Sequence, residues 1–413
     1  MILLENKIIE SLKKYSQDHV LKKLFDGEIS QEQREMLISQ LSEVDFEMIN
    51  SSFEEKSRGK LSKMPVITLD IIEKNQKAYF ERGAEILRSG KAAAVMLAGG
   101  QGTRLGFSKP KGCFNIGITR TLSIFEAHIE NLSALARNID CPKIPLYIMT
   151  SEINNDETVE FFKENNYFGY GAENVKFYKQ QSAACTDLDG KLLFEDKYSL
   201  SRSPNGNGGW FSSLLSSEHG EEFRARAYEW LGMFSVDNPL HKICDPLFLG
   251  ALAIDGAACA IKAIKKAHPY ENVGALCLED GLPSMIAYSE MTDELRFAKD
   301  ESGEYLYNFG DTANFIFNVP KLLGICQNGT PALPIHRMKK KIPFMDENGQ
   351  FIEPSEPNGY KYEMIAFDLM TTLGSAMAFE ADRQKEFAPI KNLHGEDSVD
   401  SARELLKQNG IKL

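Results

Sequence analysis

Short, almost wholly apolar runs recur along the middle of the chain, and they define its predicted architecture. A run of this kind that ends in glycines or polar residues is typical of a strand buried on both faces of a parallel sheet. Stretches with helical spacing lie between the runs, for example residues 121–137 and 155–163. Strands that alternate with helices predict an α/β fold with a doubly wound, mostly parallel, Rossmann-like sheet. The predicted strands lie within residues 92–100, 144–151, 174–181, 229–238 and 258–266.

The N-terminal end of the chain has a helical pattern instead. Leu3, Ile8, Ile9 and Leu12 recur at helical spacing. Further along, Ser30 is followed three residues later by Gln33, which is the pattern of a capping box that opens a helix. No recognisable chemistry accompanies these residues, so they are predicted to form a helical cap on the main domain.

The pattern changes again towards the C-terminal end. Two short strands around a Gly-Leu-Pro turn, within residues 273–291, predict a small antiparallel insertion. The stretch "SVDSARELLKQNG" predicts a last amphipathic helix. We therefore expect an N-terminal helical segment (1–60), a main α/β domain (61–395) and a C-terminal helix (396–413).

Composition narrows the class of protein. The chain has 413 residues, a net charge of −12, and 43% hydrophobic and 26% charged residues, as in soluble globular proteins. The acidic excess argues against a nucleic-acid partner. Its seven scattered cysteines have no CxxC spacing, which favours reduced thiols in a cytoplasmic protein. No apolar run is long enough for a membrane span, so no membrane partner is expected.

One stretch, "LAGGQGTRLGFSKPKG" (residues 97–112), combines several glycines, which have no side chain, with positively charged residues. The dinucleotide pattern G-x-G-x-x-G fails because position 105 is leucine, and the P-loop pattern fails because Phe107 follows Gly106. A purely structural glycine turn would leave the charges unexplained. Arg104 and Lys111 instead indicate a loop that binds phosphate groups, whose oxygens can accept from backbone N–H groups and cationic side chains.

The form "LAGGQGTRLG" followed by "PKG" resembles the nucleotidyltransferase loop of the UDP-sugar pyrophosphorylases, in the branch that makes UDP-N-acetylglucosamine. The resemblance extends from about residue 60 to about residue 395. Each further motif is short, but together they follow the order of the family. These motifs are "KFYKQQSAAC" with Gln181, "RSPNGNGG" with Gly206 and Asn207, "SVDNPL" with Asp237, "AYSEM" with Glu290, "FGDTANFIF" with Asn314 (the family's G-N-x-A-N), "PNGYKYEMIAFD" with Lys361 and Phe367, and "EFAPIKN" with Lys391.

The resemblance implies a reaction and a set of site residues. UTP and N-acetylglucosamine-1-phosphate would give UDP-N-acetylglucosamine and pyrophosphate, in a catalytic domain formed by residues 61–395. Mg²⁺ would be the cofactor, with Asp237 as its ligand, and a monomer is expected. The implied catalytic residues are Arg104, Lys111 and Lys391; the nucleotide would contact Leu97, Ala98, Gly99, Gly100, Gln181, Gly206 and Asn207; the sugar would contact Gly274, Glu290, Asn314 and Phe367; and Lys361 would face a phosphate.

Several alternatives stay open at this point. A preference for glucose, galactose or several sugars is one, because Ile365 stands where the family has the first of two aromatic residues. A nucleotide-sugar sensor without catalysis is another. Taken singly, Asn207 could be a turn residue, Asp237 a helix cap and Lys391 a surface lysine. Longer relatives continue into a C-terminal β-rich domain, whereas only a terminal helix is expected after Lys391.

Overall fold

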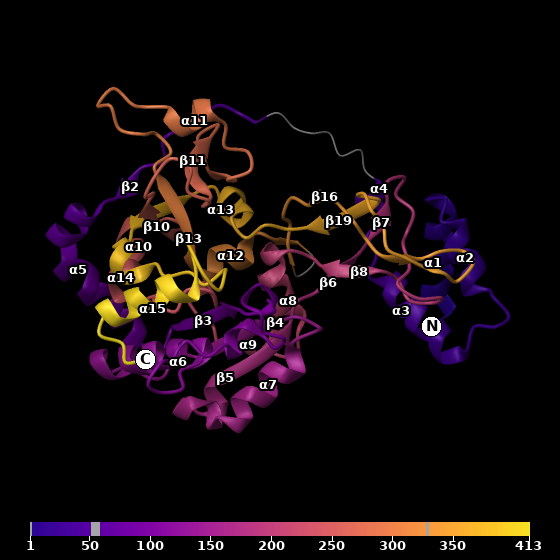
Figure 1. Ribbon diagram of the computed structural model, residues 1–413, viewed down its shortest axis with the longest axis horizontal. Helices are drawn as coiled ribbons and strands as arrows, with labels where there is room; N and C mark the ends of the chain where they lie inside the picture. Colours follow the sequence, from indigo (N-terminus) through magenta and orange to yellow (C-terminus); the bar gives the residue numbers. More distant parts are fainter. Residues whose placement is uncertain (1, 51–57, 328–329) are drawn as a thin grey trace. The chain divides into compact units, whose positions relative to one another are not determined.

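The computed structural model describes residues 2–50, 58–327 and 330–413, which fall into two compact units. The first unit combines Met1–Ser57 with Gln181–Gly209 and Leu333–Ala366. The second combines Arg58–Gln180, Trp210–Ala332 and Phe367–Leu413. Both units are therefore built from chain segments that are distant in sequence (Figure 1).

The second unit contains the predicted sheet. The main path runs β2 (Val66–Ile67), β20 (Ala376–Glu380), β10 (Cys259–Lys265), β13 (Phe309–Asn318), β9 (Trp230–Ser235), β3 (Ala92–Leu97), β4 (Leu146–Thr150), β5 (Val175–Lys179). Strand β13 is antiparallel to both neighbours, whereas the other neighbouring pairs on this path are parallel. The prediction of a doubly wound, mostly parallel sheet is confirmed, and five of these strands coincide with the predicted apolar runs.

Helices and short strands complete the second unit. The main ones are α5 (Leu69–Arg88), α6 (Ile124–Ile139), α7 (Asn155–Glu164), α10 (Pro246–Asp255) and α15 (Val399–Gln408). Shorter elements are α8 (Trp210–Ser216), α9 (Gly220–Ala225), α11 (Asp293–Phe297), α12 (Val319–Gly324), α13 (Asp368–Leu373), α14 (Arg383–Glu386), β14 (Cys326–Gln327) and β15 (Thr330–Pro331). Helices α5 and α10 approach so closely that a Cβ at Gly250 would lie 1.8 Å from the Tyr79 carbonyl oxygen. The predicted helices 121–137, 155–163 and the C-terminal one are confirmed.

The predicted antiparallel insertion is also present in the second unit. Strands β11 (Ala275–Glu279) and β12 (Leu282–Ile286) form a hairpin, and β1 (Leu61–Ser62) pairs with the other edge of β11. The hairpin joins the main sheet through one pairing, between Ala275 of β11 and Gly310 of β13. This contact holds the chain just before β11 against β13. The predicted sugar contact Gly274 lies there, directly before Ala275.

The first unit differs from the expected N-terminal segment. Its helices are α1 (Ile2–Lys14), α2 (Asp18–Leu24), α3 (Gln31–Ser42) and α4 (Phe46–Asn50), and the Ser30–Gln33 capping box is confirmed at the start of α3. Its strands are β6 (Ser182–Ala184), β7 (Thr186–Asp187), β8 (Arg202–Pro204), β16 (His336–Lys340), β17 (Phe344–Met345), β18 (Phe351–Ile352) and β19 (Gly359–Glu363).

Hydrophobic packing explains why the unit boundaries do not follow the expected 1–60 and 61–395 division. Leu12, Leu24 and Leu37 of the helices share one buried cluster with Phe194 and Tyr362. Burying these apolar faces together draws the segments 181–209 and 333–366 out of the expected main domain and joins them to the N-terminal helices. Nothing in the local pattern of residues 1–60 indicates these distant partners.

Candidate functional site

The glycine-rich loop begins where β3 ends, at Leu97. The Ala98 N–H donates to the Met149 carbonyl oxygen (2.8 Å), which continues the β3–β4 pairing, and the Lys111 N–H donates to the Gly100 carbonyl oxygen (3.1 Å), which closes the loop. A Cβ at Gly100 would meet no atom within 4 Å, whereas one at Gly99 would meet the Gln180 side chain at 3.4 Å. The loop therefore presents an open backbone face beyond the carboxyl end of a parallel strand, which is where ligands bind in open α/β sheets.

A buried asparagine holds this loop in place. Asn154, at the start of α7, is fully buried, and its side-chain amide donates to the carbonyl oxygens of Ala98 (2.9 Å) and Gly100 (3.3 Å). Its side-chain oxygen accepts from the Ser151 N–H at 2.8 Å. Asn154 was not predicted from the sequence, although a polar residue that closely follows a strand end is the kind of signal that could have indicated it.

The structure brings together two of the predicted residues directly. Lys111 begins the short 3₁₀ helix Lys111–Cys113, and Asp237 follows β9 after one residue. The Lys111 Nζ atom lies 3.0 Å from Asp237 Oδ1, and the two side chains are 14% and 30% exposed. The ammonium and the carboxylate are thus paired but still reachable by a ligand.

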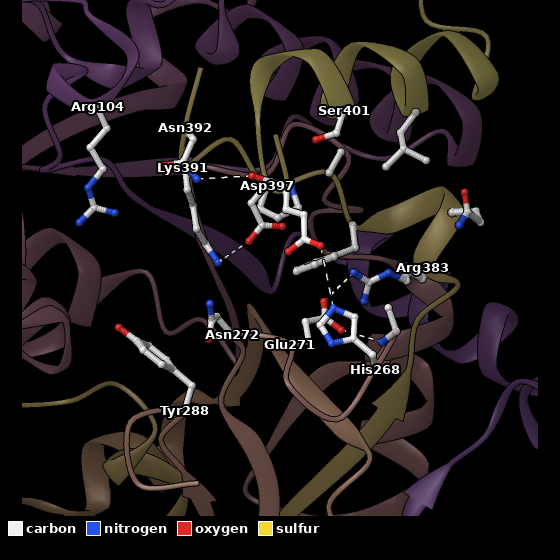
Figure 2. A pocket seen from close by; sticks show the side chains of 17 residues that line it. Arg104, His268, Glu271, Asn272, Tyr288, Arg383, Lys391, Asn392, Asp397 and Ser401 are labelled. Atoms are coloured by element: carbon white, nitrogen blue, oxygen red, sulfur yellow. Dashed lines mark hydrogen bonds and ion pairs between the residues drawn. The ribbon is translucent and has the colours of Figure 1, made fainter. Parts of the chain in front are cut away.

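Two other predicted residues line one cavity of about 590 Å³ in the second unit (Figure 2). Arg104 comes from the glycine-rich loop, and Lys391 comes from the segment before α15. Arg104 is exposed and has no hydrogen bond or ion pair with another residue of the described ranges. A third cation in the cavity wall, Arg383, is held by Glu271 at 2.6 Å. The lining also contains Glu271, Glu396 and Asp397. Among the described residues, Arg104 is thus the arginine of this wall that stays available to an anionic ligand.

Lys391 is anchored by a residue that the sequence did not indicate. The Asp397 carboxylate lies 2.8 Å from the Lys391 Nζ atom. The Asp397 carbonyl oxygen also accepts from the N–H groups of Lys391 (2.7 Å) and Asn392 (3.0 Å). Asp397 adopts a left-handed conformation (φ 49°), which closes this tight turn. No motif separates such an aspartate from an ordinary loop residue, because the contact depends on the fold of the turn.

Two of the predicted sugar contacts, Gly274 and Asn314, lie next to an irregularity in β13. Ile261 of β10 pairs with Phe315, but Ala263 pairs with Asp311, so β13 carries two extra residues at this point. Bulges of this kind re-aim side chains next to active sites. The Asp311 N–H donates to the Gly274 carbonyl oxygen (2.8 Å), and the buried Asn314 amide lies 3.5 Å from the Lys242 carbonyl oxygen. The Gly274 carbonyl is thus bonded to the main chain of Asp311, three positions before Asn314.

Asp311 itself is a site residue that sequence reasoning missed. Burial raises the pKa of its carboxyl to about 6, although the Ala313 N–H bond and the nearby Lys391 charge oppose the rise. It stands where the family pattern has its first asparagine. Of the other predicted sugar contacts, Phe367 is half-buried at the start of α13, and Glu290 is paired with Arg58 at 2.8 Å.

The remaining predicted residues belong to the first unit. Gly206 has φ +84°, and a Cβ there would lie 2.2 Å from the Met364 carbonyl oxygen, so this turn requires glycine. The Asn207 side-chain oxygen accepts from the Ala366 N–H at 2.9 Å, and the Gln181 carbonyl oxygen accepts from the Asn205 N–H at 3.1 Å. Lys361 lines a cavity of about 340 Å³ together with Arg202 and Glu195. Their roles toward a ligand stay predictions.

The donor set for the predicted Mg²⁺ contains a single carboxylate. Within residues 2–50, 58–327 and 330–413, no group of three or more His, Cys, Asp or Glu side chains could hold a metal ion. Mg²⁺ commonly binds to one or two carboxylates together with substrate phosphates, rather than in a cage of protein ligands. The partly exposed Asp237 carboxylate fits this arrangement.

The sequence matches a known protein family. A family model described as UTP–glucose-1-phosphate uridylyltransferase matches residues 37–408. The chain belongs to this uridylyltransferase family.

Relatives named for N-acetylglucosamine include a yeast enzyme and a trypanosome enzyme. The UDP-N-acetylglucosamine pyrophosphorylase of Saccharomyces cerevisiae is 36% identical over 393 residues, which span 93% of this chain and 82% of the yeast protein. The crystal structure of the Trypanosoma brucei uridine diphosphate N-acetylglucosamine pyrophosphorylase superposes with a TM-score of 0.80 at 27% identity, over 98% of this chain and 84% of that one. A Leishmania major UDP-glucose pyrophosphorylase variant (TM-score 0.67, 19% identity, 91% and 77% coverage) shares the fold.

Proposed function

We propose that this chain transfers the uridylyl group of UTP to N-acetylglucosamine-1-phosphate, giving UDP-N-acetylglucosamine and pyrophosphate. The observation that carries the proposal is the cavity of about 590 Å³ in which Arg104 and Lys391, from segments far apart in sequence, lie together. Both substrates carry phosphates, which must approach one another for transfer. Cations from two segments can offset the repulsion between these negatively charged phosphates. The likeness to the yeast enzyme supports N-acetylglucosamine as the sugar.

The proposed chemistry is a direct displacement. A phosphate oxygen of the sugar-1-phosphate attacks the α-phosphorus of UTP, the bond from that phosphorus to the bridging oxygen breaks, and pyrophosphate leaves with the electron pair. The nucleophile is already an anion, so no protein group has to remove a proton. The work of the protein is therefore positioning and charge neutralisation.

Each cationic side chain has a part in this scheme. Arg104 and Lys111 stabilise the charge that grows on the departing pyrophosphate. Lys391 holds the phosphate of the sugar substrate. Asp237 would hold Mg²⁺, which supplies charge neutralisation to the phosphate oxygens when bound. In this proposal, Lys111 would turn from Asp237 to a phosphate of the bound nucleotide, which would leave the Asp237 carboxylate available as the metal ligand.

The solution state and compartment belong to the same proposal. We expect a monomer, which size-exclusion chromatography with light scattering tests. The cytoplasmic assignment is supported by the seven cysteines, none of which forms a disulfide. Within the part of the chain that the structure describes, no helix combines the length and the apolar character needed to cross a membrane.

Pyrophosphate release from UTP tests the proposed function. Four sugar-1-phosphates serve as acceptors: those of N-acetylglucosamine, N-acetylgalactosamine, glucose and galactose. We expect N-acetylglucosamine-1-phosphate to give the highest kcat/KM. A higher value for glucose-1-phosphate would move the chain to the UDP-glucose activity that the family description names. Binding of UTP without pyrophosphate release from any acceptor would favour a sensor instead of an enzyme.

A further inference from the structure

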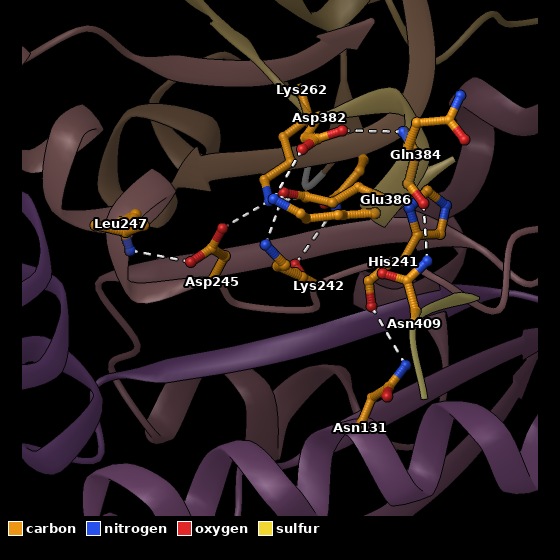
Figure 3. A network of polar contacts seen from close by, with 12 residues as sticks. Asn131, His241, Lys242, Asp245, Leu247, Lys262, Asp382, Gln384, Glu386 and Asn409 are labelled. Atoms are coloured by element: carbon orange, nitrogen blue, oxygen red, sulfur yellow. Dashed lines mark hydrogen bonds and ion pairs between the residues drawn. The ribbon is translucent and has the colours of Figure 1, made fainter. Parts of the chain in front are cut away.

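A buried network of charges lies beside the candidate site and is not part of the proposed chemistry. Lys262 of β10 is 1% exposed, and its ammonium is paired with Asp245 at 2.7 Å and with the Glu386 carboxylate (Figure 3). Burial alone would raise the pKa of Asp245 and lower that of Lys262. Their mutual attraction, with Lys242 and Glu386, outweighs burial, so the pKa of Asp245 is lowered, that of Lys262 is raised, and both stay charged.

Such a network is costly to bury, which raises the question of what it holds in place. Asp245 caps the start of α10 by accepting from the Leu247 N–H at 3.1 Å. Glu386 ends α14, in the segment that leads to Lys391. Lys262 therefore connects the C-terminal segment of the unit to the central sheet. The half-exposed Lys242 adds a second ion pair to Glu386, with 3.0 Å between its Nζ atom and the carboxylate.

Asn238 continues this connection to the candidate site. It is 2% exposed, and its side-chain amide donates to the Glu386 carbonyl oxygen at 2.7 Å. Its side-chain oxygen accepts from the Ala388 N–H at 2.9 Å. One residue earlier, the Asp237 carbonyl oxygen accepts from the Ile390 N–H, also at 2.9 Å. The segment 386–390 is thus bonded to Asp237 and Asn238 at every second residue.

These bonds fix the main chain next to two of the predicted site residues. Asp237 immediately precedes Asn238, and Lys391 immediately follows Ile390. The backbone positions of the predicted metal ligand and of the predicted sugar-phosphate lysine are therefore fixed by the same set of contacts. The Lys262 carbonyl oxygen also accepts from Thr312 at 2.8 Å, which joins the β13 irregularity to the same residue.

We propose that Asn238 and Glu386, held by Lys262, are positioning residues that set the separation between Asp237 and Lys391 during uridylyl transfer. This inference rests on the proposed function. Neither residue has to touch a substrate. They act by keeping the α-phosphorus of the nucleotide and the attacking phosphate oxygen at reacting distance, where a misplacement of about 1 Å costs roughly a hundredfold in rate.

The variants Asn238→Ala and Glu386→Ala test this role. We expect kcat to fall roughly ten- to hundredfold in each. The affinity for UTP, measured by calorimetry, should stay within about threefold, because the nucleotide loop is supported separately by Asn154. Glu386→Gln keeps the shape and one acceptor for Lys262, so it should recover most of the lost kcat. Lys242→Met removes the exposed branch of the same network and is the matched control, with kcat within about twofold of wild type.

Different outcomes contradict the positioning role and the proposed function. Folded alanine variants with kcat within about twofold of wild type would overturn the positioning role. A loss of UTP affinity equal to the loss of kcat would also overturn it, because such a result indicates general structural damage. If the alanine variants fail to fold, Asn238→Ser and Glu386→Gln are judged by the same two measurements, with a kcat loss of about fivefold expected for Asn238→Ser. No turnover by the wild-type chain would instead refute the proposed function, and this inference with it.

Discussion

Two lysine–aspartate pairs in the second unit look alike but are built differently. Lys111 and Asp237 are 126 positions apart and meet at 3.0 Å through their side chains, whereas Lys391 and Asp397 are six positions apart and meet at 2.8 Å within one turn. In the second pair, the Asp397 backbone also accepts from Lys391, so side chain and main chain act together. The first pair depends on its side chains alone, whereas main-chain bonds would keep Lys391 close to Asp397 even without the ion pair.

This difference suggests how the two lysines serve opposite ends of the reaction. A pair formed only by side chains can exchange partners when phosphate and metal arrive, because each ion of the pair finds a new counter-ion. A pair closed into a turn keeps its lysine in one place whether or not a ligand is present, which favours pre-organisation on the sugar side. The two pairs should therefore respond unequally to the same kind of substitution.

The largest effect is expected for Asp237→Asn. The substitution keeps the shape of the side chain and removes the charge that would hold the metal. Metal charge neutralisation contributes several kcal/mol to such transition states, so kcat should fall by about two to three orders of magnitude. Steady-state kinetics over a range of Mg²⁺ concentrations measure this. Turnover close to wild type at ordinary Mg²⁺ levels would show that Asp237 is not the metal ligand.

A somewhat smaller effect is expected for Lys111→Ala. Negative charge moves onto the pyrophosphate as its bond breaks, so this cation should act more strongly on the transition state than on bound UTP. We expect kcat to fall about a hundredfold, with a smaller rise in the KM for UTP. Lys111→Arg should not restore full activity, because a planar guanidinium cannot replace a compact ammonium.

Lys109→Ala is the matched control for this prediction. Lys109 is exposed two positions earlier in the loop, and its side chain forms no ion pair with the described residues. Its kcat should stay within about threefold of wild type, because an isolated exposed charge contributes little. If Lys111→Ala raised KM and left kcat unchanged, the loop would only hold the nucleotide, and the exchange assigned to the first pair would have no catalytic purpose.

A third prediction compares the second pair with the first. Asp397→Asn leaves both main-chain bonds to the turn intact and removes only the ion pair, whose side chains are 36% and 26% exposed. We expect stability to change by less than about 1 kcal/mol and kcat/KM for the sugar phosphate to fall about three- to tenfold. Thermal unfolding and initial rates measure the two effects. A kcat loss as large as that of Asp237→Asn would contradict the distinction between the pairs.

The contrast between the pairs also shows what the sequence could reveal. The strands β3, β4 and β9 were predictable because strands buried on both faces read as continuous apolar runs. Strand β13 was not, because its bulge places polar residues such as Asp311 and Asn314 in the middle of the strand. The first unit was not predictable either, because its helices bury their apolar faces against Phe194 and Tyr362, about 150 or more positions away.

The candidate site divides in the same way. Arg104, Lys111, Asp237 and Lys391 lie in short motifs, and each motif could be recognised locally. Asp397 serves the site through the conformation of a turn that it shares with Lys391, and no recognised sequence motif marks that turn. The sequence thus indicated the groups expected to meet the substrate, but not the groups that hold them.

The smallest expected effect concerns the carboxyl group near Lys391, that of Asp311. Its pKa is raised by burial to about 6, above the ordinary value of 3.8. Between these two values the folded chain binds more protons at this site than the unfolded chain, so the free energy of unfolding falls as pH rises through this window and is constant above it. Asp311→Asn keeps an acceptor for the Ala313 N–H and removes the titration. The free energy of unfolding of the variant, relative to that of wild type, should therefore be about 1 kcal/mol higher at pH 7.5 than at pH 5. Thermal unfolding at both pH values would measure this difference.

Asp346→Asn is the control. Backbone N–H bonds, that of Gln350 foremost, lower the pKa of Asp346, so its titration lies below pH 5. Its substitution should therefore shift Tm equally at both pH values. An equal shift for Asp311→Asn as well would mean that this carboxyl is ionised at pH 5, so that at this pH the sugar side of the site carries one more negative charge near Lys391 than we infer.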